Sequence, residues 1–353
     1  MSAEDIRVLV VDDSAFNRRT ISEILETSGM AKVVGVARDG EEGIKKAFDS
    51  RPDLITLDLE MPRMDGFTFL RIVMKSLPTP VLVISSRSED KNVFKALELG
   101  AIDFLAKPAN HLKTTEVLRD ELITKLKVVK ELKFRNVQRR MGQVTAPVTA
   151  PVVREVDKEP EKMVDAVVIG ASTGGPSALQ SVISALPQDL DAAVLISQHM
   201  PAGFTRAFAE RLDRNCPLRI KEAEEGDLVE PGRVLVAPGG MNLLVDKKGG
   251  SIRAVLREKE DSDKYVPSVN ALFKSAASVF GHKLLAVVLT GMGNDGAEGV
   301  VSIKNAGGQI IAESEKTSIV FGMPREAIET QMVDETLNIE DVPLWIVKRC
   351  RSK

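Results

Sequence analysis

The amino-acid sequence predicts an α/β protein built from two doubly wound parallel sheets joined by a linker. Short apolar, β-branched runs alternate with amphipathic helical patterns in both halves of the chain, which is typical of parallel sheets covered by helices. The alternation stops between Gly142 and Lys162, where three prolines indicate a semi-rigid spacer. At 353 residues the chain has the length of about two domains. We therefore expect domains at residues 1–127 and 163–353, with a linker at 128–162.

Composition narrows the class of protein. A net charge of −3 argues against nucleic-acid binding carried by bulk positive charge. The two cysteines, Cys216 and Cys350, cannot form a disulfide framework and lack metal-ligand spacing, which favours a reducing compartment. The acidic start of the chain does not have the pattern of a signal peptide, and no apolar run is long enough to span a bilayer. We expect a cytoplasmic monomer that is not inserted in a membrane.

The first domain is expected to alternate strands with helices. The strands are expected at Ile6–Val11, Val33–Ala37, Leu54–Leu57, Val81–Ile84 and Ile102–Ala106. The helices are expected at Ala15–Ser28, Glu41–Asp49, Gly66–Ser76 and Asp90–Leu99. In a doubly wound sheet the binding site lies at the carboxyl ends of the strands.

Acidic, hydroxyl and basic side chains follow the predicted strands of this domain. Asp12 and Asp13 follow the first strand, Asp58 the third, Ser85 the fourth and Lys107 the fifth. Three carboxylates at one point repel one another and stay ionised only beside a cation, and this number of oxygen ligands suits Mg²⁺. The lysine and the hydroxyl would then hold the oxygens of a phosphoryl group. The alternative is that each acid caps the helix after its strand, which explains one position well and the whole set poorly.

The set resembles the receiver domain of two-component response regulators, a flavodoxin-like fold, along the whole first segment. The resemblance implies that Asp58 is the acceptor of a phosphoryl group. It also implies a Mg²⁺ ion held by Asp13, Asp58 and the backbone carbonyl of Glu60, with Asp12 acting through water. Residues 60–66 (Glu-Met-Pro-Arg-Met-Asp-Gly) match the loop that follows the acceptor in this family.

Three further positions take their roles from the same resemblance. Lys107 would contact the phosphoryl group, and Ser85 would be the hydroxyl that follows that group when the domain switches. Phe104 stands where many receivers have tyrosine. A movement of this ring would therefore signal by packing and not through a phenol hydroxyl.

The segment after the receiver, residues 116–140, has apolar side chains at helical spacing among many lysines and arginines. A basic amphipathic helix can bind a membrane surface or nucleic acid. We favour the other interpretation, in which the last helix of the domain runs into a solvated tail.

The second domain repeats the alternation of strands and helices. Its strands are expected at Val164–Ile169, Ala192–Ser197, Val234–Ala237, Leu284–Thr290 and Gln309–Ala312. Its helices are expected at Pro176–Ala185, Phe204–Leu212, Ser268–Val279, Ala297–Asn305 and Arg325–Glu329.

The first strand of the second domain ends in a glycine-rich turn that carries a serine. Residues 170–174 (Gly-Ala-Ser-Thr-Gly) fit the Gly-x-Ser-x-Gly pattern of hydrolase nucleophile turns, and Pro176 suits the first turn of a helix. Ser172 would therefore stand between a strand end and a helix N-terminus. The alternative is an anion-binding or structural turn, because glycine–serine turns are common.

The chain has only three histidines, so candidates for a general base are few. His111 lies near a helix start in the first domain, and His282 precedes its strand, at the amino edge of the sheet. His199 follows its strand, as Ser172 and Asp295 follow theirs, so these three share the edge where α/β sheets build their sites. The imidazole would make the serine nucleophilic, and the carboxylate would fix the imidazole tautomer. The chain order Ser, His, Asp disfavours the α/β-hydrolase fold.

An oxyanion formed on a substrate carbonyl needs backbone N–H donors. Met292, in the glycine-rich loop Gly291–Gly296, is our first candidate for a donor. Thr173, the residue after the serine, is the second.

The second domain resembles the chemotaxis protein-glutamate methylesterases, and together with the receiver the likeness covers nearly the whole chain. The segments that carry it are residues 170–175, 198–204, 237–240, 267–269, 289–296 and 320–324. The resemblance implies a Rossmann-like serine esterase that removes methyl groups from glutamates of chemoreceptors, releases methanol and in many members deamidates glutamines. It implies Ser172, His199 and Asp295 as the triad and no cofactor for ester hydrolysis. It also implies that a chemotaxis histidine kinase donates the phosphoryl group to Asp58, and that the receiver covers the active site until it is phosphorylated. Asn270 departs from the family pattern, because we expect aspartate at this position in many relatives.

Three other functions fit parts of the pattern. A receiver-controlled transcription factor needs a helix-turn-helix or winged element with a basic face, whereas the second half alternates strands and helices. A nucleotide-binding module would use the glycine-rich turn, but residues 170–176 lack a Gly-x-Gly-x-x-Gly series and a phosphate-loop lysine. A catalytically inactive adaptor is the third.

Overall fold

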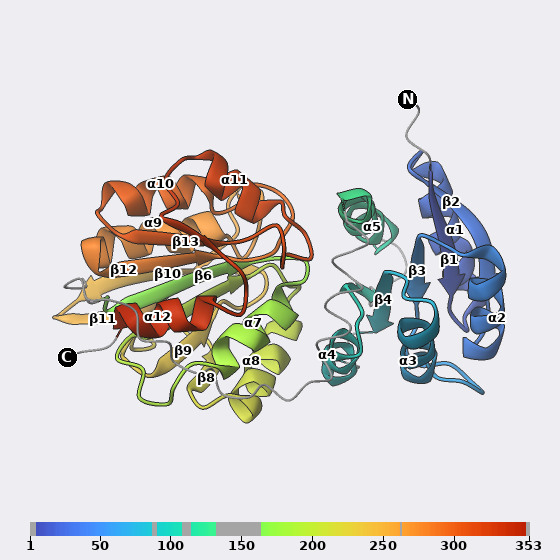
Figure 1. Ribbon diagram of the computed structural model, residues 1–353, viewed down its shortest axis with the longest axis horizontal. Helices are drawn as coiled ribbons and strands as arrows, with labels where there is room; N and C mark the ends of the chain where they lie inside the picture. Colours follow the sequence, from blue (N-terminus) through green and yellow to red (C-terminus); the bar gives the residue numbers. More distant parts are fainter. Residues whose placement is uncertain (1–4, 87–89, 108–113, 132–163, 262, 351–353) are drawn as a thin grey trace. The chain divides into compact units, whose positions relative to one another are not determined.

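The computed structural model describes residues 5–86, 90–107, 114–131, 164–261 and 263–350. The chain divides into two units, Met1–Thr145 and Ala146–Lys353, and each is an α/β fold of its own (Figure 1). The proposed linker lies outside the described residues except at its start, where helix α5 (Thr114–Glu131) continues past Lys127. Within the described ranges, no helix has both the length and the apolar character needed to cross a bilayer.

The first unit is a five-stranded parallel sheet in the order β2-β1-β3-β4-β5, the flavodoxin-like order. Its strands are β1 (Ile6–Val11), β2 (Ala31–Ala37), β3 (Leu54–Leu57), β4 (Val81–Ser86) and β5 (Asp103–Lys107). Its helices besides α5 are α1 (Ala15–Thr27), α2 (Gly40–Ser50), α3 (Gly66–Ser76) and α4 (Asp90–Glu98). Buried side chains of α1 and α5 pack together on one face of this sheet. The predicted fold class is confirmed for this unit.

Local sequence explains where three of these helices begin. The side chains of Ser14, Asp39 and Asp65 each accept a hydrogen bond from a backbone N–H in the first turn of α1, α2 and α3. These residues satisfy helix N–H groups that have no partner inside the helix.

The second unit contains a seven-stranded parallel sheet in the order β14-β13-β12-β6-β7-β9-β8. Its strands are β6 (Ala166–Ala171), β7 (Ala193–Gln198), β8 (Arg219–Glu222), β9 (Arg233–Val236), β12 (Leu284–Val288), β13 (Gln309–Glu313) and β14 (Glu335–Leu337). The chain leaves β6 to build one side of the sheet and later returns to place β12 on the other side. This reversal is a topological switch point, where α/β sheets open a crevice for ligands.

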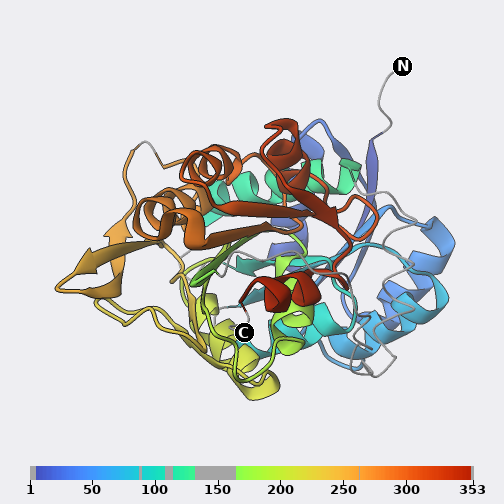
Figure 2. The same ribbon diagram turned by 60° about the vertical axis from the view of Figure 1, so that its left-hand side comes forward.

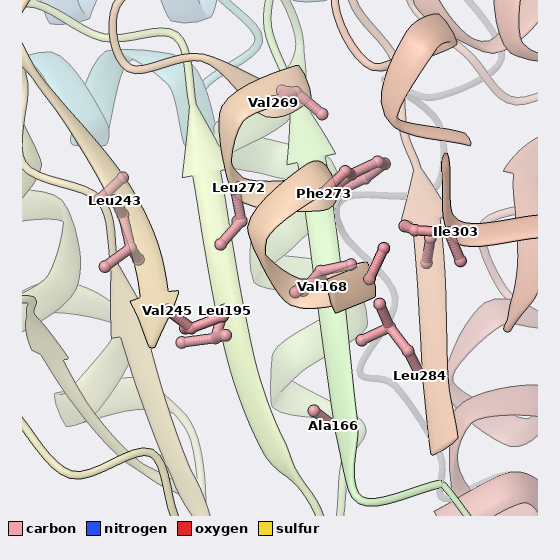
Figure 3. Packing of buried hydrophobic residues seen from close by; sticks show 14 of the residues in the cluster. Ala166, Val168, Leu195, Leu243, Val245, Val269, Leu272, Phe273, Leu284 and Ile303 are labelled. Atoms are coloured by element: carbon pink, nitrogen blue, oxygen red, sulfur yellow. The ribbon is translucent and has the colours of Figure 1, made fainter. Parts of the chain in front are cut away.

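Helices cover both faces of this sheet (Figure 1). They are α7 (Gly175–Ser184), α8 (Phe204–Asn215), α9 (Val269–Phe280), α10 (Ala297–Asn305), α11 (Met323–Glu329) and α12 (Val342–Cys350). Figure 3 shows α9 lying across the strands that carry Val168 and Leu195, with Phe273 between them and Ile303 of α10. Gly170 permits this close packing, because a Cβ atom there would lie 2.3 Å from a methyl carbon of Val269.

Several elements of the second unit are absent from the sequence prediction. The strands β10 (Met241–Lys248) and β11 (Ser251–Glu258) form a separate antiparallel hairpin, seen apart from the main sheet in Figure 2. Gly249 and Gly250 close it with positive φ angles of 58° and 85°, as a tight hairpin turn requires. Their apolar runs, residues 243–245 and 254–256, are short and flanked by polar and charged residues, so they were not recognised as strands. The short strands β8 and β14 and the helix α12 were also missed.

Candidate active site

The serine turn stands at the carboxyl end of β6, directly at the switch point. Ser172 is 7% exposed, and its N–H donates to the carbonyl of Thr290 at 3.0 Å. The turn closes with a 2.8 Å hydrogen bond from the N–H of Gly175 to the carbonyl of Ser172, and α7 begins there. Gly174 has a φ of 79°, a left-handed conformation that glycine adopts without strain. The predicted strand–turn–helix setting of Ser172 is therefore present.

The end of β7 lies beside this turn. Ala171 and Gln198 are paired in register, so Ser172 and His199 are the next residues on two adjacent strands. The side-chain Nε2 of Gln198 donates to the carbonyl oxygens of both Ser172 and His199, each at 2.9 Å. One buried amide thus ties the serine turn to the histidine loop. Gly175 makes room for it, because a Cβ atom there would lie 1.9 Å from Oε1 of Gln198.

The imidazole of His199 is paired with a buried carboxylate. Its Nε2 lies 2.7 Å from Oδ2 of Asp295, which is 2% exposed. The same carboxylate accepts hydrogen bonds from the N–H of Val269 at 2.8 Å, the N–H of Asn270 at 2.9 Å and the Ser268 hydroxyl at 3.1 Å. Burial opposes ionisation of Asp295, but His199 and the two backbone donors outweigh it and hold the pKa of Asp295 below its usual value.

The N-terminus of α9 therefore holds the acid in its charged form. A helix start carries unpaired N–H groups and positive potential, which stabilise an anion. Because Nε2 of His199 faces Asp295, a proton from a serine hydroxyl would have to pass to Nδ1, the other ring nitrogen. The structure brings His199 and Asp295 into contact and sets Ser172 on the neighbouring strand end.

The glycine-rich loop that carries Asp295 is held against the serine turn. The hydroxyl of Thr290 donates to the carbonyl of Thr173 at 3.0 Å, and Gly291 pairs with the segment around Phe321. A Cβ atom on Gly291 would lie 2.8 Å from Cβ of Ser172, so only glycine lets the backbone come this close. The proposed oxyanion donors, Met292 and Thr173, thus belong to two segments that meet at the serine.

The acidic residues of the first unit also converge. Oxygen atoms of Asp12, Asp13 and Asp58 lie within 4.8 Å of one another. The ammonium of Lys107 lies 2.6 Å from Oδ2 of Asp58 and 3.1 Å from Oδ2 of Asp12. The strand ends thus bring together the acids and the lysine that the sequence singled out.

The electrostatics of this cluster leave an excess of negative charge. Burial raises the pKa of Asp58 to about 6, because the attraction of Lys107 only partly offsets burial and the repulsion of Asp12. Burial also opposes the charge of Lys107, but the two carboxylates outweigh it and raise the pKa of Lys107. Three carboxylate groups beside one ammonium fit a hard divalent cation such as Mg²⁺.

The two switch candidates are buried in the structure. Ser85 lies at the end of β4 and is fully buried, and Phe104 on β5 is 5% exposed. The ring of Phe104 meets that of Phe94 on α4 edge to face, with centroids 6.3 Å apart. The side chain of Glu60 is exposed. His111 lies outside the described residues, and His282 precedes β12, as predicted.

Comparison with known proteins agrees with this architecture. The family model for CheB methylesterase matches residues 167–346, and that for the response regulator receiver domain matches residues 8–119. A Geobacter sulfurreducens protein named protein-glutamate methylesterase/protein-glutamine glutaminase 3 is 51% identical, over 98% of this chain and 97% of that protein. The chain belongs to the CheB methylesterase family.

A second relative and a solved structure are similar to this chain as well. A Pyrococcus abyssi protein named protein-glutamate methylesterase/protein-glutamine glutaminase is 43% identical, over 99% of this chain and 94% of its own length. The crystal structure of the Thermotoga maritima CheB methylesterase catalytic domain matches with a TM-score of 0.51 and 39% identity. The match covers 52% of this chain and 98% of that domain.

Sequence reasoning missed residues that support the site in this CheB family member. Asn270, noted only as a departure, accepts hydrogen bonds through Oδ1 from the N–H groups of Gly296 and Gly299, at 3.0 and 2.8 Å. Only an oxygen acceptor is used there, so asparagine and aspartate both suit the position. Tyr265, which stacks on His199, was not singled out. Its being the only tyrosine in the chain is the one signal that could have drawn attention to it.

Proposed function

We propose that this chain is a phosphorylation-controlled protein-glutamate methylesterase and protein-glutamine glutaminase that acts on chemoreceptors. Residues 163–353 form its catalytic domain and residues 1–127 its receiver. The observation that carries the proposal is the 2.7 Å contact between His199 and Asp295 at a strand end next to the serine turn. Membership of the CheB methylesterase family supports the substrate class.

Ser172 is the nucleophile of the reaction. His199 Nδ1 accepts the serine proton while the serine oxygen attacks the ester carbonyl of a methylated glutamate. The resulting oxyanion receives hydrogen bonds from the N–H groups of Met292 and Thr173, and a donor of this kind contributes about 10²–10³ in rate. The imidazolium then protonates the leaving methoxide. Methanol departs and an acyl-enzyme ester with Ser172 remains.

The second half of the reaction uses the same groups in reverse order. His199 removes a proton from water, which attacks the acyl-enzyme, and the protonated imidazole returns that proton to Ser172 as glutamate is released. Deamidation follows the same route with ammonia as the leaving group. The negative charge of Asp295 stabilises the imidazolium in both halves. None of these steps needs a cofactor.

In the receiver, Asp58 accepts the phosphoryl group. An oxygen of Asp58 forms the new bond to phosphorus as the bond to the histidine nitrogen of the kinase breaks. Asp12, Asp13, Asp58 and the Glu60 carbonyl would hold Mg²⁺, which would neutralise charge on the phosphoryl oxygens. Lys107 pairs with those oxygens. The hydroxyl of Ser85 moves toward the phosphoryl group, and the ring of Phe104 changes its packing. A tenfold activation of the esterase needs only about 1.4 kcal/mol of difference between the inhibited and active arrangements.

Methanol release from a methylated chemoreceptor fragment tests the esterase. We expect Ser172→Ala and His199→Ala to abolish release, while the exposed controls Ser181→Ala and His282→Ala leave it unchanged. Ammonia release from glutamine sites should follow the same pattern. Full activity of Ser172→Ala would refute the proposed mechanism. A wild-type chain that stays inactive on a correctly methylated fragment in the presence of acetyl phosphate and Mg²⁺ would refute the function.

Receiver control is tested separately. Methanol release by the full chain is compared with and without acetyl phosphate and Mg²⁺, and with release by residues 163–353 alone. We expect activation that is lost in Asp58→Asn and after chelation of Mg²⁺, and kept in the exposed control Asp49→Asn. If residues 163–353 are no faster than the unphosphorylated full chain, inhibition by the receiver is wrong.

A further inference from the structure

The only tyrosine of the chain lies flat against the proposed catalytic base. The ring of Tyr265 and the imidazole of His199 have centroids 4.8 Å apart and planes inclined by 8°. Tyr265 comes from the segment before α9, far in sequence from β7. Neither strand-end topology nor the Ser–His–Asp pattern accounts for this contact.

A buried side chain of the β10–β11 hairpin fixes the segment that carries Tyr265. Asn242 is fully buried, its Nδ2 donates to Asp263 at 2.8 Å, and its Oδ1 accepts from the N–H of Ser268 at 2.8 Å. Arg257 on β11 donates to the same Asp263 carboxylate at 2.9 and 3.0 Å. The hairpin thus holds both ends of the segment that carries Tyr265.

The hydroxyl end of Tyr265 rests against the glycine-rich loop. A Cβ atom on Gly293 would lie 2.4 Å from the tyrosine Oη, so the loop backbone closes on the ring there. Lys264 makes a cation–π contact with the same ring, with its Nζ 5.1 Å from the ring centroid. The ring therefore stands in contact with both His199 and the loop that carries Asp295.

We propose that Tyr265 is a positioning residue that sets the plane of the His199 imidazole. The single hydrogen bond from Nε2 to Asp295 leaves the ring able to rotate about that bond. A flat aromatic surface against one face of the imidazole restricts this rotation and so holds the plane in which Nδ1 lies. This inference rests on the proposed esterase function, because it assigns Tyr265 a role in orienting the base.

Two substitutions at one position separate the stacked ring from its hydroxyl. In the full-length chain, Tyr265→Phe keeps the ring, and we expect its kcat within twofold of wild type. Tyr265→Leu removes the flat face, and we expect kcat to fall about tenfold, equivalent to about 1.4 kcal/mol of transition-state stabilisation. KM should stay within twofold in both variants, since Tyr265 acts through His199.

A nuclear magnetic resonance measurement supplies a readout independent of activity. In a His111→Gln/His282→Gln background the only imidazole is that of His199, and the only tyrosine ring is that of Tyr265. We expect nuclear Overhauser contacts between the two rings. We also expect ring-current shielding of the imidazole protons that Tyr265→Phe retains and Tyr265→Leu loses. If the leucine variant unfolds at the assay temperature, Tyr265→Met replaces it.

Each outcome decides the inference. Wild-type kcat in Tyr265→Leu, or equal losses in the phenylalanine and leucine variants, would overturn a role for the stacked ring. Absence of contacts between the rings would overturn it on structural grounds. If the wild-type chain releases methanol and Ser172→Ala does not, such failures concern Tyr265 alone. A wild type that stays inactive with acetyl phosphate and Mg²⁺ would instead refute the proposed function, and the resonance measurement would still decide the stacking.

Discussion

The carboxylate of Asp295 accepts four hydrogen bonds, two on each oxygen: from the Ser268 hydroxyl and the N–H of Asn270 on Oδ1, and from His199 and the N–H of Val269 on Oδ2. An asparagine at position 295 has only one acceptor oxygen. Whichever way its amide turns, Asp295→Asn sets an NH₂ group against a backbone N–H at the start of α9. The substitution therefore affects stability and catalysis together.

The size of both effects follows from this geometry. A hydrogen bond to a charged group contributes about 1.5–3 kcal/mol, and an anion at a helix N-terminus adds about 0.3–1 kcal/mol. We expect Asp295→Asn to lower the free energy of unfolding by about 3 kcal/mol. If the NH₂ group faces His199, Nε2 must become the acceptor and the ring proton moves to Nδ1. The serine then loses its base, and kcat should fall by about 10⁴, as in other triads.

The effect on stability should depend on pH in a defined direction. The pKa of Asp295 is lowered in the folded chain, whereas an unfolded aspartate titrates near about 3.9. The stabilisation is fully present above the unfolded pKa and is lost as pH falls through the folded pKa. The difference in unfolding free energy between wild type and Asp295→Asn should therefore be constant above about pH 5 and shrink below about pH 4.

The assays are methanol release at pH 7 and urea unfolding of the full chain from neutral to acid pH. The exposed Asp261→Asn serves as the control and should match wild type in both. A wild-type kcat in Asp295→Asn, or a stability difference as large at pH 3 as at pH 7, would refute this account of the carboxylate.

Three further predictions concern other parts of the second unit. Gly291→Ala puts a methyl group 2.4 Å from the sulfur of Met323, and overpacking of this kind costs about 1–3 kcal/mol. We therefore expect kcat to fall at least about tenfold and the melting temperature to drop. An unchanged kcat would contradict this. Glu313 is fully buried and accepts from the N–H of Thr290, so Glu313→Gln should cost about 1–3 kcal/mol in urea unfolding, and an unchanged midpoint would be the opposing result. Burial raises the pKa of Cys216 to about 11 and that of Cys350 to about 12. Because the thiolate is the reactive form, both thiols should react with an aromatic disulfide at pH 8 much more slowly in the native chain than in urea. Equal rates in the two states would contradict this.

Much of the site could be predicted from the sequence because its residues directly follow parallel strands. Apolar runs buried on both faces are recognisable without a partner, so the central strands β1, β3, β6 and β12 were predicted within about two residues. Parallel strands share one carboxyl edge, so residues that follow them are neighbours whatever their separation along the chain. For this reason Asp12, Asp13 and Asp58 could be grouped in advance, and so could His199 and Asp295.

The sequence by itself determined the two α/β sheets and which side chains stand at their shared edges. Tertiary structure alone decided which imidazole nitrogen meets Asp295, that the start of α9 supplies the donors to that carboxylate, and that Tyr265 covers His199. The hairpin β10–β11 alternates apolar residues that face the core, such as Ile252, Ala254 and Leu256, a short signal that the sequence prediction missed. The Asp263–Ser268 segment carries no hydrophobic period that would reveal it. The positions of both come from buried hydrogen bonds, such as those of Asn242, between segments that are distant in the chain, and no local pattern encodes such contacts.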